Sequence, residues 1–191
     1  MSKISLTLPL TNEEIRRLKI GDTVLLSGII VTARDMAHSW LLEEKREELS
    51  ELLRNSAIYH CGPIMLKEEG KWICKAAGPT TSIREEAYMA EILQEYGISA
   101  VIGKGGMGER TAKALQEFSA VYLSAVGGAA VLLADHIESV EAVYQLEEFG
   151  VPEALWVLKI KAMPLIVSMD SHGNSLHKNV LEKSCFVLNN K

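Results

Sequence analysis

The 191-residue sequence has few of the features that would place it in a specialised structural class. It has only three cysteines (Cys61, Cys74 and Cys185), and their odd number and irregular spacing predict neither a disulfide framework nor a local iron–sulfur ligand cluster. We therefore expect a reducing, cytoplasmic location. No apolar run reaches the roughly 18 residues of a membrane-spanning helix. The opening residues also lack the charged and apolar regions of a signal peptide.

The sequence also lacks a large net charge of either sign. The net charge is −5, so no global basic field would attract nucleic acid. Hydrophobic residues make up 48% of the chain and charged residues 24%, which is the balance of a soluble globular protein. The sequence shows no repeat, low-complexity segment or linker, and its length fits one domain spanning residues 1–191.

Periodicity and capping patterns predict a chain in which strands and helices alternate. A capping box at Thr11 and Glu14 starts a short helix. The expected strands cover residues 4–10, 23–31, 57–60, 98–102, 120–125, 155–160 and 165–169, with a hairpin within 65–75. The longer expected helices cover residues 37–55, 81–96 and 109–118, and the polar tail after residue 170 is expected to be irregular. This order predicts an α/β domain with more than one sheet.

The first segment with chemical potential is Thr-Ala-Arg-Asp-Met-Ala-His at residues 32–38, between a buried strand and a helix. Arg34 offers a planar pair of donors that suits a carboxylate, although a surface ion pair is an equally good interpretation. Asp35 is expected to cap the helix. His38 alone indicates little, because a single histidine is usually structural.

The second segment is Gly-Pro-Thr-Thr-Ser-Ile-Arg at residues 78–84, where a turn leads into a helix. Free N–H groups at a helix start favour anions. Arg84 lies four residues after Thr80, so we expect both to face the same way near the first turn. Amide donors, a hydroxyl and a guanidinium would then converge on a carboxylate or phosphate. An ordinary Thr-capped helix with a solvated Arg is the alternative.

The third segment is Gly-Lys-Gly-Gly-Met-Gly at residues 103–108, which formally matches the dinucleotide fingerprint. That fingerprint also needs an acidic residue at the end of the next strand. The strand ends in Ser124-Ala125-Val126-Gly127, and Asp135 comes too late. The remaining interpretations are a loop that lets backbone approach a ligand beside Lys104, or a plain tight turn. Together, Arg34, Arg84, Lys104 and Thr80 indicate a site for a small polyanion, such as a dicarboxylate.

Four motifs in order resemble the C-terminal domain of class I fumarases, and the resemblance covers about residues 4–180. They are the three segments above, extended to 77–84 and 102–108, and Tyr-His-Cys-Gly-Pro at residues 59–63. The same domain also occurs as the separate β subunit of two-subunit fumarases and of L-tartrate dehydratase. The resemblance implies a swivelling β/β/α fold, with mixed sheets and flanking helices.

The resemblance further implies reversible hydration of fumarate to L-malate at a [4Fe–4S] cluster. The α-type partner would hold this cluster, and its open iron would act as a Lewis acid on the malate hydroxyl. Arg34, Arg84 and Lys104 match the family's carboxylate ligands, and Thr80 matches its proposed catalytic base. Gly78, Thr81, Gly103 and Gly105 are candidate substrate-loop contacts. A hetero-oligomer, such as α2β2, is expected.

Three other interpretations stay open. One is the β subunit of an L-tartrate dehydratase, since the residues that bind carboxylates do not distinguish fumarate from tartrate or a methyl-substituted relative. Another is a free-standing module that binds small anions or nucleotides through residues 103–108. The last is a structural subunit whose own residues do no chemistry.

Overall fold

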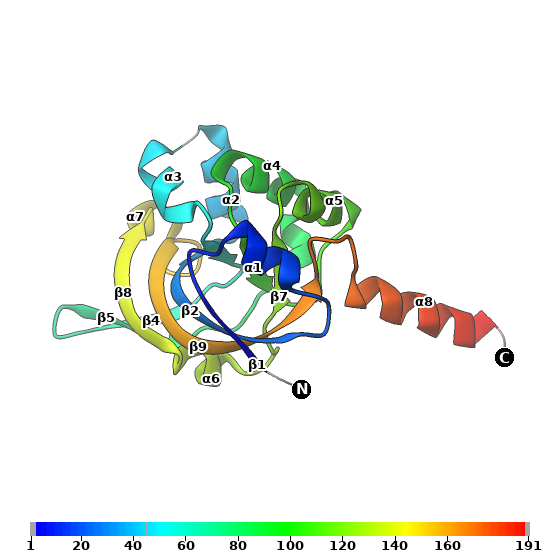
Figure 1. Ribbon diagram of the computed structural model, residues 1–191. Helices are drawn as coiled ribbons and strands as arrows, with labels where there is room; N and C mark the ends of the chain where they lie inside the picture. Colours follow the sequence, from blue (N-terminus) through cyan, green and yellow to red (C-terminus); the bar gives the residue numbers. More distant parts are fainter. Residues whose placement is uncertain (1–2, 45, 190–191) are drawn as a thin grey trace.

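Five strands close into a ring at the centre of the structure, a computed structural model that describes residues 3–44 and 46–189 (Figure 1). The strands are β2 (Thr23–Thr32), β3 (Ala57–Tyr59), β6 (Ala100–Gly103), β7 (Val121–Ser124) and β9 (Leu155–Met169). The first four pair in parallel, and β9 runs antiparallel to both β7 and β2, which closes the ring. The predicted α/β class is confirmed, whereas the closure was not predicted.

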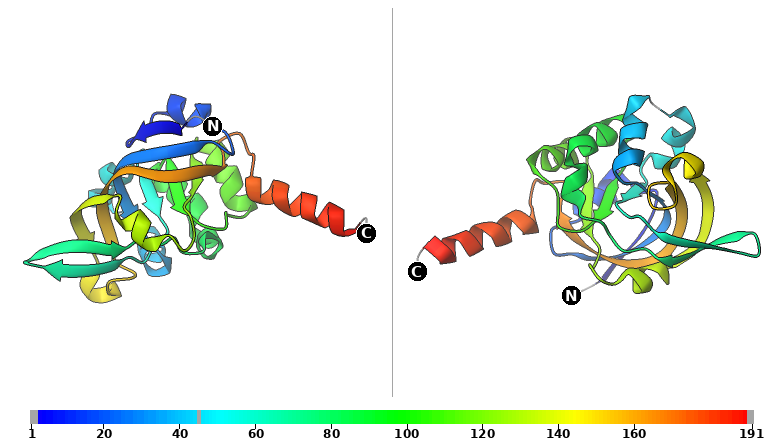
Figure 2. Two further views of the ribbon diagram at one scale, coloured as in Figure 1. Left: turned by 90° about the horizontal axis from the view of Figure 1, so that it is seen from below. Right: turned by 180° about the vertical axis from the view of Figure 1, so that it is seen from behind.

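Four further strands extend this ring or project from it. β1 (Lys3–Thr7) pairs in parallel with the first half of β2, and β8 (Ile137–Tyr144) pairs with the first half of β9. The predicted hairpin is present as β4 (Ile64–Glu68) and β5 (Lys71–Ala76), which extend away from the body (Figure 2). The prediction missed β8, an edge strand in which two exposed glutamates interrupt half-buried residues.

The strand β9 is continuous, although two strands meeting near Pro164 were predicted. A local break does exist, because Ala162 has a positive φ of 49° and the pairing with β2 shifts register between Leu26 and Gly28. The Ser27 hydroxyl accepts the Ala162 N–H at 2.9 Å. The long strand β2 therefore pairs with β9 on both sides of the irregularity. In the sequence alone, the same irregularity resembles the end of a strand.

Most of the longer helices cover one side of the ring, at the top of Figure 1. These are α2 (Asp35–Glu43), α3 (Glu47–Leu53), α4 (Glu86–Tyr96) and α5 (Glu109–Glu117). A 3₁₀ turn, η1 (Ser82–Glu85), leads into α4. Three short helices lie elsewhere: α1 (Asn12–Arg17), which has the predicted capping box, α6 (Ala130–Ala134) and α7 (Leu146–Phe149).

Two helices replace the single one predicted for residues 37–55. The Tyr96 hydroxyl, which comes from the end of α4, occupies the break between α2 and α3. It accepts the Arg46 N–H at 3.0 Å and donates to the Leu41 carbonyl at 2.8 Å. A distant tyrosine thus satisfies the backbone groups that the interruption frees.

The tail forms the helix α8 (Leu176–Asn189), so the prediction of an irregular tail was wrong. The helix points away from the body in all views (Figures 1 and 2). Its base is anchored by His177, whose Nε2 lies 3.1 Å from the Ser168 hydroxyl. An i,i+4 pair of Lys178 and Glu182 supports the exposed first turns. No helix in the described ranges is both long and apolar enough to cross a membrane.

Alternation along the ring strands divides the buried side chains into two cores. Tyr59, Ile102 and Leu123 belong to one core together with Trp156 of β9. Ile58 and Val101 belong to the other core, with side chains of α2 to α5. Because successive strand residues point to opposite faces, each short parallel strand contributes to both cores.

We expect Tyr96→Phe to lower the free energy of unfolding by about 1–3 kcal/mol, because it leaves two backbone groups of the α2–α3 break without their partner. Denaturant unfolding would measure this loss. Tyr144→Phe, on the half-buried edge strand β8, is the matched control and should change stability by less than about 0.5 kcal/mol. Equal effects of the two substitutions would contradict the role assigned to the Tyr96 hydroxyl.

Candidate functional site

A short backbone ladder places Thr80 and Thr81 beside Lys104. The Lys104 N–H donates to the Thr80 carbonyl at 3.3 Å, and the Ser82 N–H donates to the Lys104 carbonyl at 3.0 Å. The Thr80 N–H donates to the His60 carbonyl at 2.7 Å. The N–H and the carbonyl of Thr80 therefore both form hydrogen bonds. These bonds fix the position of the Thr80 backbone, from which its half-buried side chain extends.

The hydroxyl residues before α4 do not act as ordinary helix caps. Thr81 precedes η1, and its side chain makes no capping hydrogen bond. Thr80 lies before η1 and outside any helix, so the expected helical i,i+4 relation to Arg84 is wrong. Arg84 is instead connected to the ladder by its N–H, which donates to the Thr81 carbonyl at 3.3 Å, and its side chain is exposed.

Arg34 reaches the same region from the segment that follows β2. Its side chain passes over Gly62, where an added Cβ would lie 3.0 Å from Arg34 Nη1. The neighbouring Cys61 forms a backbone bridge with Pro79, one residue before Thr80. Successive contacts therefore join Arg34 to the Thr80–Lys104 ladder.

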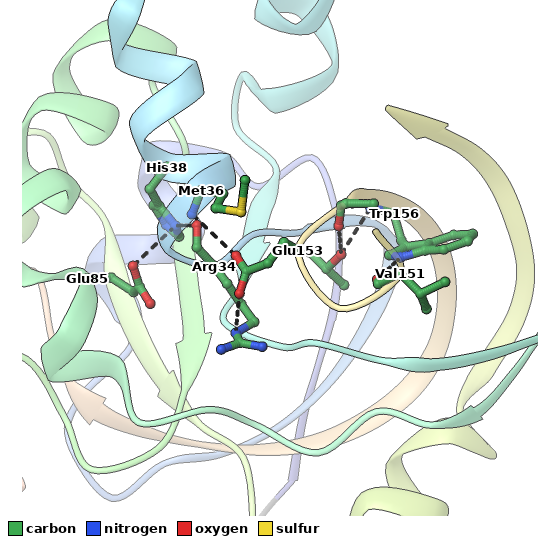
Figure 3. A network of polar contacts seen from close by, with 9 residues as sticks. Arg34, Met36, His38, Glu85, Val151, Glu153 and Trp156 are labelled. Atoms are coloured by element: carbon green, nitrogen blue, oxygen red, sulfur yellow. Dashed lines mark hydrogen bonds and ion pairs between the residues drawn. The ribbon is translucent and has the colours of Figure 1, made fainter. Parts of the chain in front are cut away.

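Glu153, which the sequence interpretation missed, holds Arg34 and caps α2 (Figure 3). One carboxylate oxygen lies 3.2 Å from Arg34 Nε, and the other accepts the Met36 N–H at 3.2 Å. Asp35 is the first residue of α2 and not its cap, so that prediction was wrong. The ion pair engages Nε, so in the described part of the chain the two terminal nitrogens of Arg34 remain available to another carboxylate.

Behind these residues lies a buried polar cluster made of His38, His60 and Glu85, each with zero exposure. His38 Nδ1 donates to the Arg34 carbonyl at 2.8 Å and lies 3.5 Å from Glu85 Oε2 (Figure 3). The two imidazole rings meet edge to face, with centroids 5.1 Å apart. His60 Nδ1 and Nε2, His38 Nε2 and both Glu85 oxygens have no hydrogen-bond partner of standard geometry within the described residues.

The buried setting changes the protonation of this cluster. Burial lowers the pKa of His38 to about 4 and holds the pKa of His60 well below its usual value. Burial, together with the nearby Asp35 carboxyl, raises the pKa of Glu85 to about 8. At neutral pH both imidazoles and the Glu85 carboxyl are consequently uncharged.

The glycines of the site serve mainly to let parts of this chain approach each other. An added Cβ on Gly103 would collide with the Ser82 hydroxyl oxygen, and one on Gly78 would lie 3.0 Å from the Ala130 Cβ. Gly105 is exposed and has a positive φ of 83°, which glycine adopts without strain. An added Cβ on Gly127 would lie 3.7 Å from the Lys104 side chain.

The helix start that a dinucleotide would need is already occupied by a carboxylate of the same chain. Glu86 accepts the Gly108 N–H at 2.7 Å, the Thr111 N–H at 3.1 Å and the Thr111 hydroxyl at 2.8 Å. A bound pyrophosphate would use these α5 donors. This internal cap argues against the nucleotide-binding interpretation of residues 103–108.

The cysteines do not fit the ligand set of an iron–sulfur cluster. Cys61 is buried, Cys74 is half-buried and Cys185 is exposed on α8. Burial raises the pKa of the Cys61 thiol and raises that of Cys74 to about 11, which disfavours the thiolates that bind iron. Within residues 3–44 and 46–189, no three His, Cys, Asp or Glu residues gather in a way that could hold a metal ion.

One of the missed residues had a signal in the sequence. Glu85 precedes Met89, Ile92 and Tyr96 at spacings of four, seven and eleven, so it falls on the apolar stripe of its helix. A charged residue on such a stripe indicates a buried group. Glu153 had no comparable signal, because its partners lie 117 or more residues away.

Comparison with known proteins finds similar sequences. A family model described as the fumarase C-terminus matches residues 1–180. A Geobacillus stearothermophilus protein, provisionally named a class I fumarate hydratase, is 54% identical over 182 residues, which are 95% of this chain but 34% of that protein. The β subunit of L(+)-tartrate dehydratase from Escherichia coli K12 is 43% identical over 177 residues, 92% of this chain and 87% of the subunit.

A Methanocaldococcus jannaschii protein, provisionally named an L(+)-tartrate dehydratase β subunit, is 46% identical over 177 residues, 91% of each chain. This chain therefore spans about a third of the Geobacillus relative and most of the two β subunits.

We expect no NAD binding tighter than a Kd of about 100 μM, roughly 5.5 kcal/mol. The reasons are the Glu86 cap and the missing acidic residue after β7. Isothermal titration calorimetry on the purified chain measures this directly. NAD binding tighter than a Kd of about 100 μM would revive the nucleotide interpretation.

Proposed function

The chain belongs to the fumarase C-terminus family, and we propose that it is the β-type half of an iron–sulfur hydro-lyase that interconverts fumarate and L-malate. The observation that carries this proposal is the contact chain linking Arg34, Gly62, Cys61–Pro79 and the Thr80–Lys104 ladder. It links the segments of Arg34, Thr80 and Lys104 through successive contacts, which supports their assignment to one site. We treat residues 1–191 as a single domain of this type.

In this proposal the cations bind the two substrate carboxylates. Arg34 presents its terminal nitrogens while Glu153 fixes the other edge of the guanidinium. Arg84 is exposed within η1, and Lys104 is half-buried beside Thr81. Guanidinium groups can hold a carboxylate with two parallel hydrogen bonds, so the two arginines would fix the orientation of the substrate.

Thr80 is the candidate acceptor of the proton that leaves malate C3. A free alcohol is a poor base, so the site must stabilise the developing charge. Thr80 would take the proton as its alkoxide and become the neutral hydroxyl. The ladder fixes its backbone beside Lys104, and the neighbouring cations would favour both the alkoxide and the negative charge left on the substrate. The buried His38, His60 and Glu85 are neutral and so add no opposing charge.

Exposed apolar side chains lie on several of the segments around the site. This apolar rim has exposed fractions from 45% to 67% and consists of Met36, Ile83, Val126, Val131 and Leu132. Met36 and Ile83 are close in sequence to Arg34 and Arg84, and Val126 precedes Gly127 beside Lys104. A cationic site inside an apolar rim is suited to burial by a partner.

The partner we propose is an α-type subunit that carries the [4Fe–4S] cluster, in a hetero-oligomer such as α2β2. Two relatives of nearly the same length are named as β subunits, and the Geobacillus relative contains the matching region within a longer chain. The unsuitable cysteines of this chain are consistent with a cluster held elsewhere.

L-tartrate is the second candidate substrate, because the named β subunits act in tartrate dehydratases. The test is anaerobic co-expression with the candidate α subunit, followed by assays on malate, fumarate and L-tartrate. Activity on fumarate and malate supports the first proposal, and activity on tartrate alone supports the second. A stoichiometric cluster on the isolated chain would overturn the assignment of the cluster to the partner.

In the assembled complex, we expect Thr80→Val to lower kcat by about 10²–10⁴, the usual contribution of a general base, with little change in KM. Deuterium exchange at malate C3 should fall in parallel. Near-normal turnover and exchange would show that Thr80 does not transfer the proton.

Arg84→Lys keeps the charge but loses the two-pronged donor, so we expect KM to rise more than kcat falls. Arg110→Lys, in the exposed ion pair with Glu91, is the matched control and should leave both constants unchanged. A normal KM for Arg84→Lys would remove Arg84 from the substrate site.

We expect Leu132→Asp to weaken binding of the α subunit by more than tenfold, about 1.4 kcal/mol, because it places a charge in the apolar rim. Val180→Asp on α8 is similarly exposed and serves as the control. Analytical ultracentrifugation of the mixed subunits measures both. Equal weakening by the two variants would contradict docking through the rim.

A further inference from the structure

The buried cluster behind the site joins the two segments that carry the arginines. His38 lies one helical turn after Arg34 and donates to its carbonyl. Glu85 directly follows Arg84, and its Oε2 lies 3.5 Å from His38 Nδ1. This contact connects α2 to η1 and is fully shielded from solvent.

The surroundings of Glu85 do not suit a carboxylate anion. Its only ion-pair distance within the described residues is to His38, whose Nδ1–H already serves the Arg34 carbonyl. A buried carboxylate without a cationic partner is strongly disfavoured. The charged or titratable groups that act on it are Asp35 and Arg34 at the start of α2 and Glu153 before β9, and His38 of α2 lies 3.5 Å away. The rings of His60, after β3, and Tyr88, from α4, contact the His38 ring.

We propose that Glu85 is a positioning residue that joins the Arg34 segment to the Arg84 turn as a neutral carboxylic acid, so that both guanidinium charges stay available to a dianionic substrate. This inference rests on the proposed function. Asp35 and Glu153 already place two carboxyl groups near Arg34. A third negative charge at Glu85 would compete with the substrate for the same cations.

The protonation of Glu85 gives the proposal a pH signature. Its pKa is near 8 in the folded chain and about 4.5 when unfolded, so the folded state holds the proton longer. Its contribution to stability is complete below pH 4.5 and is lost as pH rises toward 8. Above pH 8 the ionised group would weaken dicarboxylate binding.

The first experiment measures unfolding free energy against pH for the isolated chain and for Glu85→Gln. The amide is neutral at every pH, so we expect the variant to lose less stability than the wild type between pH 5 and 8. Glu95→Gln, an exposed change on α4, is the control and should follow the wild type. Parallel curves for wild type and Glu85→Gln would overturn the proposal.

The second experiment measures succinate binding to the α–β complex by calorimetry at pH 7 and pH 9. We expect wild-type Kd to rise about tenfold, the effect of one added charge near the ligand. Kd should stay constant in Glu85→Gln and should be raised at both pH values in Glu85→Ala, which lacks the joining group. An equal pH dependence in wild type and Glu85→Gln would overturn the positioning role.

Because succinate is unreactive, a complex that binds it but turns over no substrate would refute the proposed activity and leave the Glu85 result intact. If succinate does not bind to the complex, the substrate-site role of Glu85 fails along with the proposed dicarboxylate site. The stability curves of the isolated chain still decide independently whether Glu85 is a neutral acid.

Discussion

The antiparallel pairing of β9 with β2 is the constraint on which the rest of the structure depends. It closes the ring that the four parallel strands begin, and β9 then continues to pair with β7. Because β2, β3, β6 and β7 are parallel, their carboxyl ends lie at the same end of the ring. The segments with Arg34, Gly62, Lys104 and Gly127 follow these four ends in turn. Ligand sites in α/β proteins commonly form at this end of the strands.

Carboxyl groups of the chain itself govern the electrostatics of the site. Glu153 holds one edge of Arg34 and caps α2, while Glu86 caps α5 and occupies its anion-binding amides. Glu85 lies deeper and is neutral at pH 7 because burial and Asp35 raise its pKa. The placement of these acids leaves positive charge at the Thr80–Lys104 ladder, and this is why we propose that an external dicarboxylate, rather than a nucleotide, binds there.

The candidate site is open to solvent, and for this reason we propose that it forms only half of a catalytic centre. Catalysis by charge stabilisation needs an environment from which water is excluded, and Arg84 is exposed. The apolar rim offers the surface that a partner would cover. In the Geobacillus relative the matching region is about a third of one chain, whereas in the β subunits it is most of a separate chain. Among these relatives, the matching region therefore occurs both as part of a longer chain and as most of a separate subunit.

The sequence by itself determined the mixed α/β class, the hairpin, the α1 capping box and the segments around residues 34, 80 and 104. These follow from periodicity, turn residues and local spacing, which act over a few residues. Only the tertiary structure decided the closure by β9, the α2–α3 break at Tyr96, the Glu153–Arg34 pair and the burial of Glu85. Each of these depends on groups from segments that are distant in the sequence, and no local pattern specifies which distant group will supply the missing hydrogen bond or charge. The helix at residues 176–189 differs, since its local spacing could have predicted it.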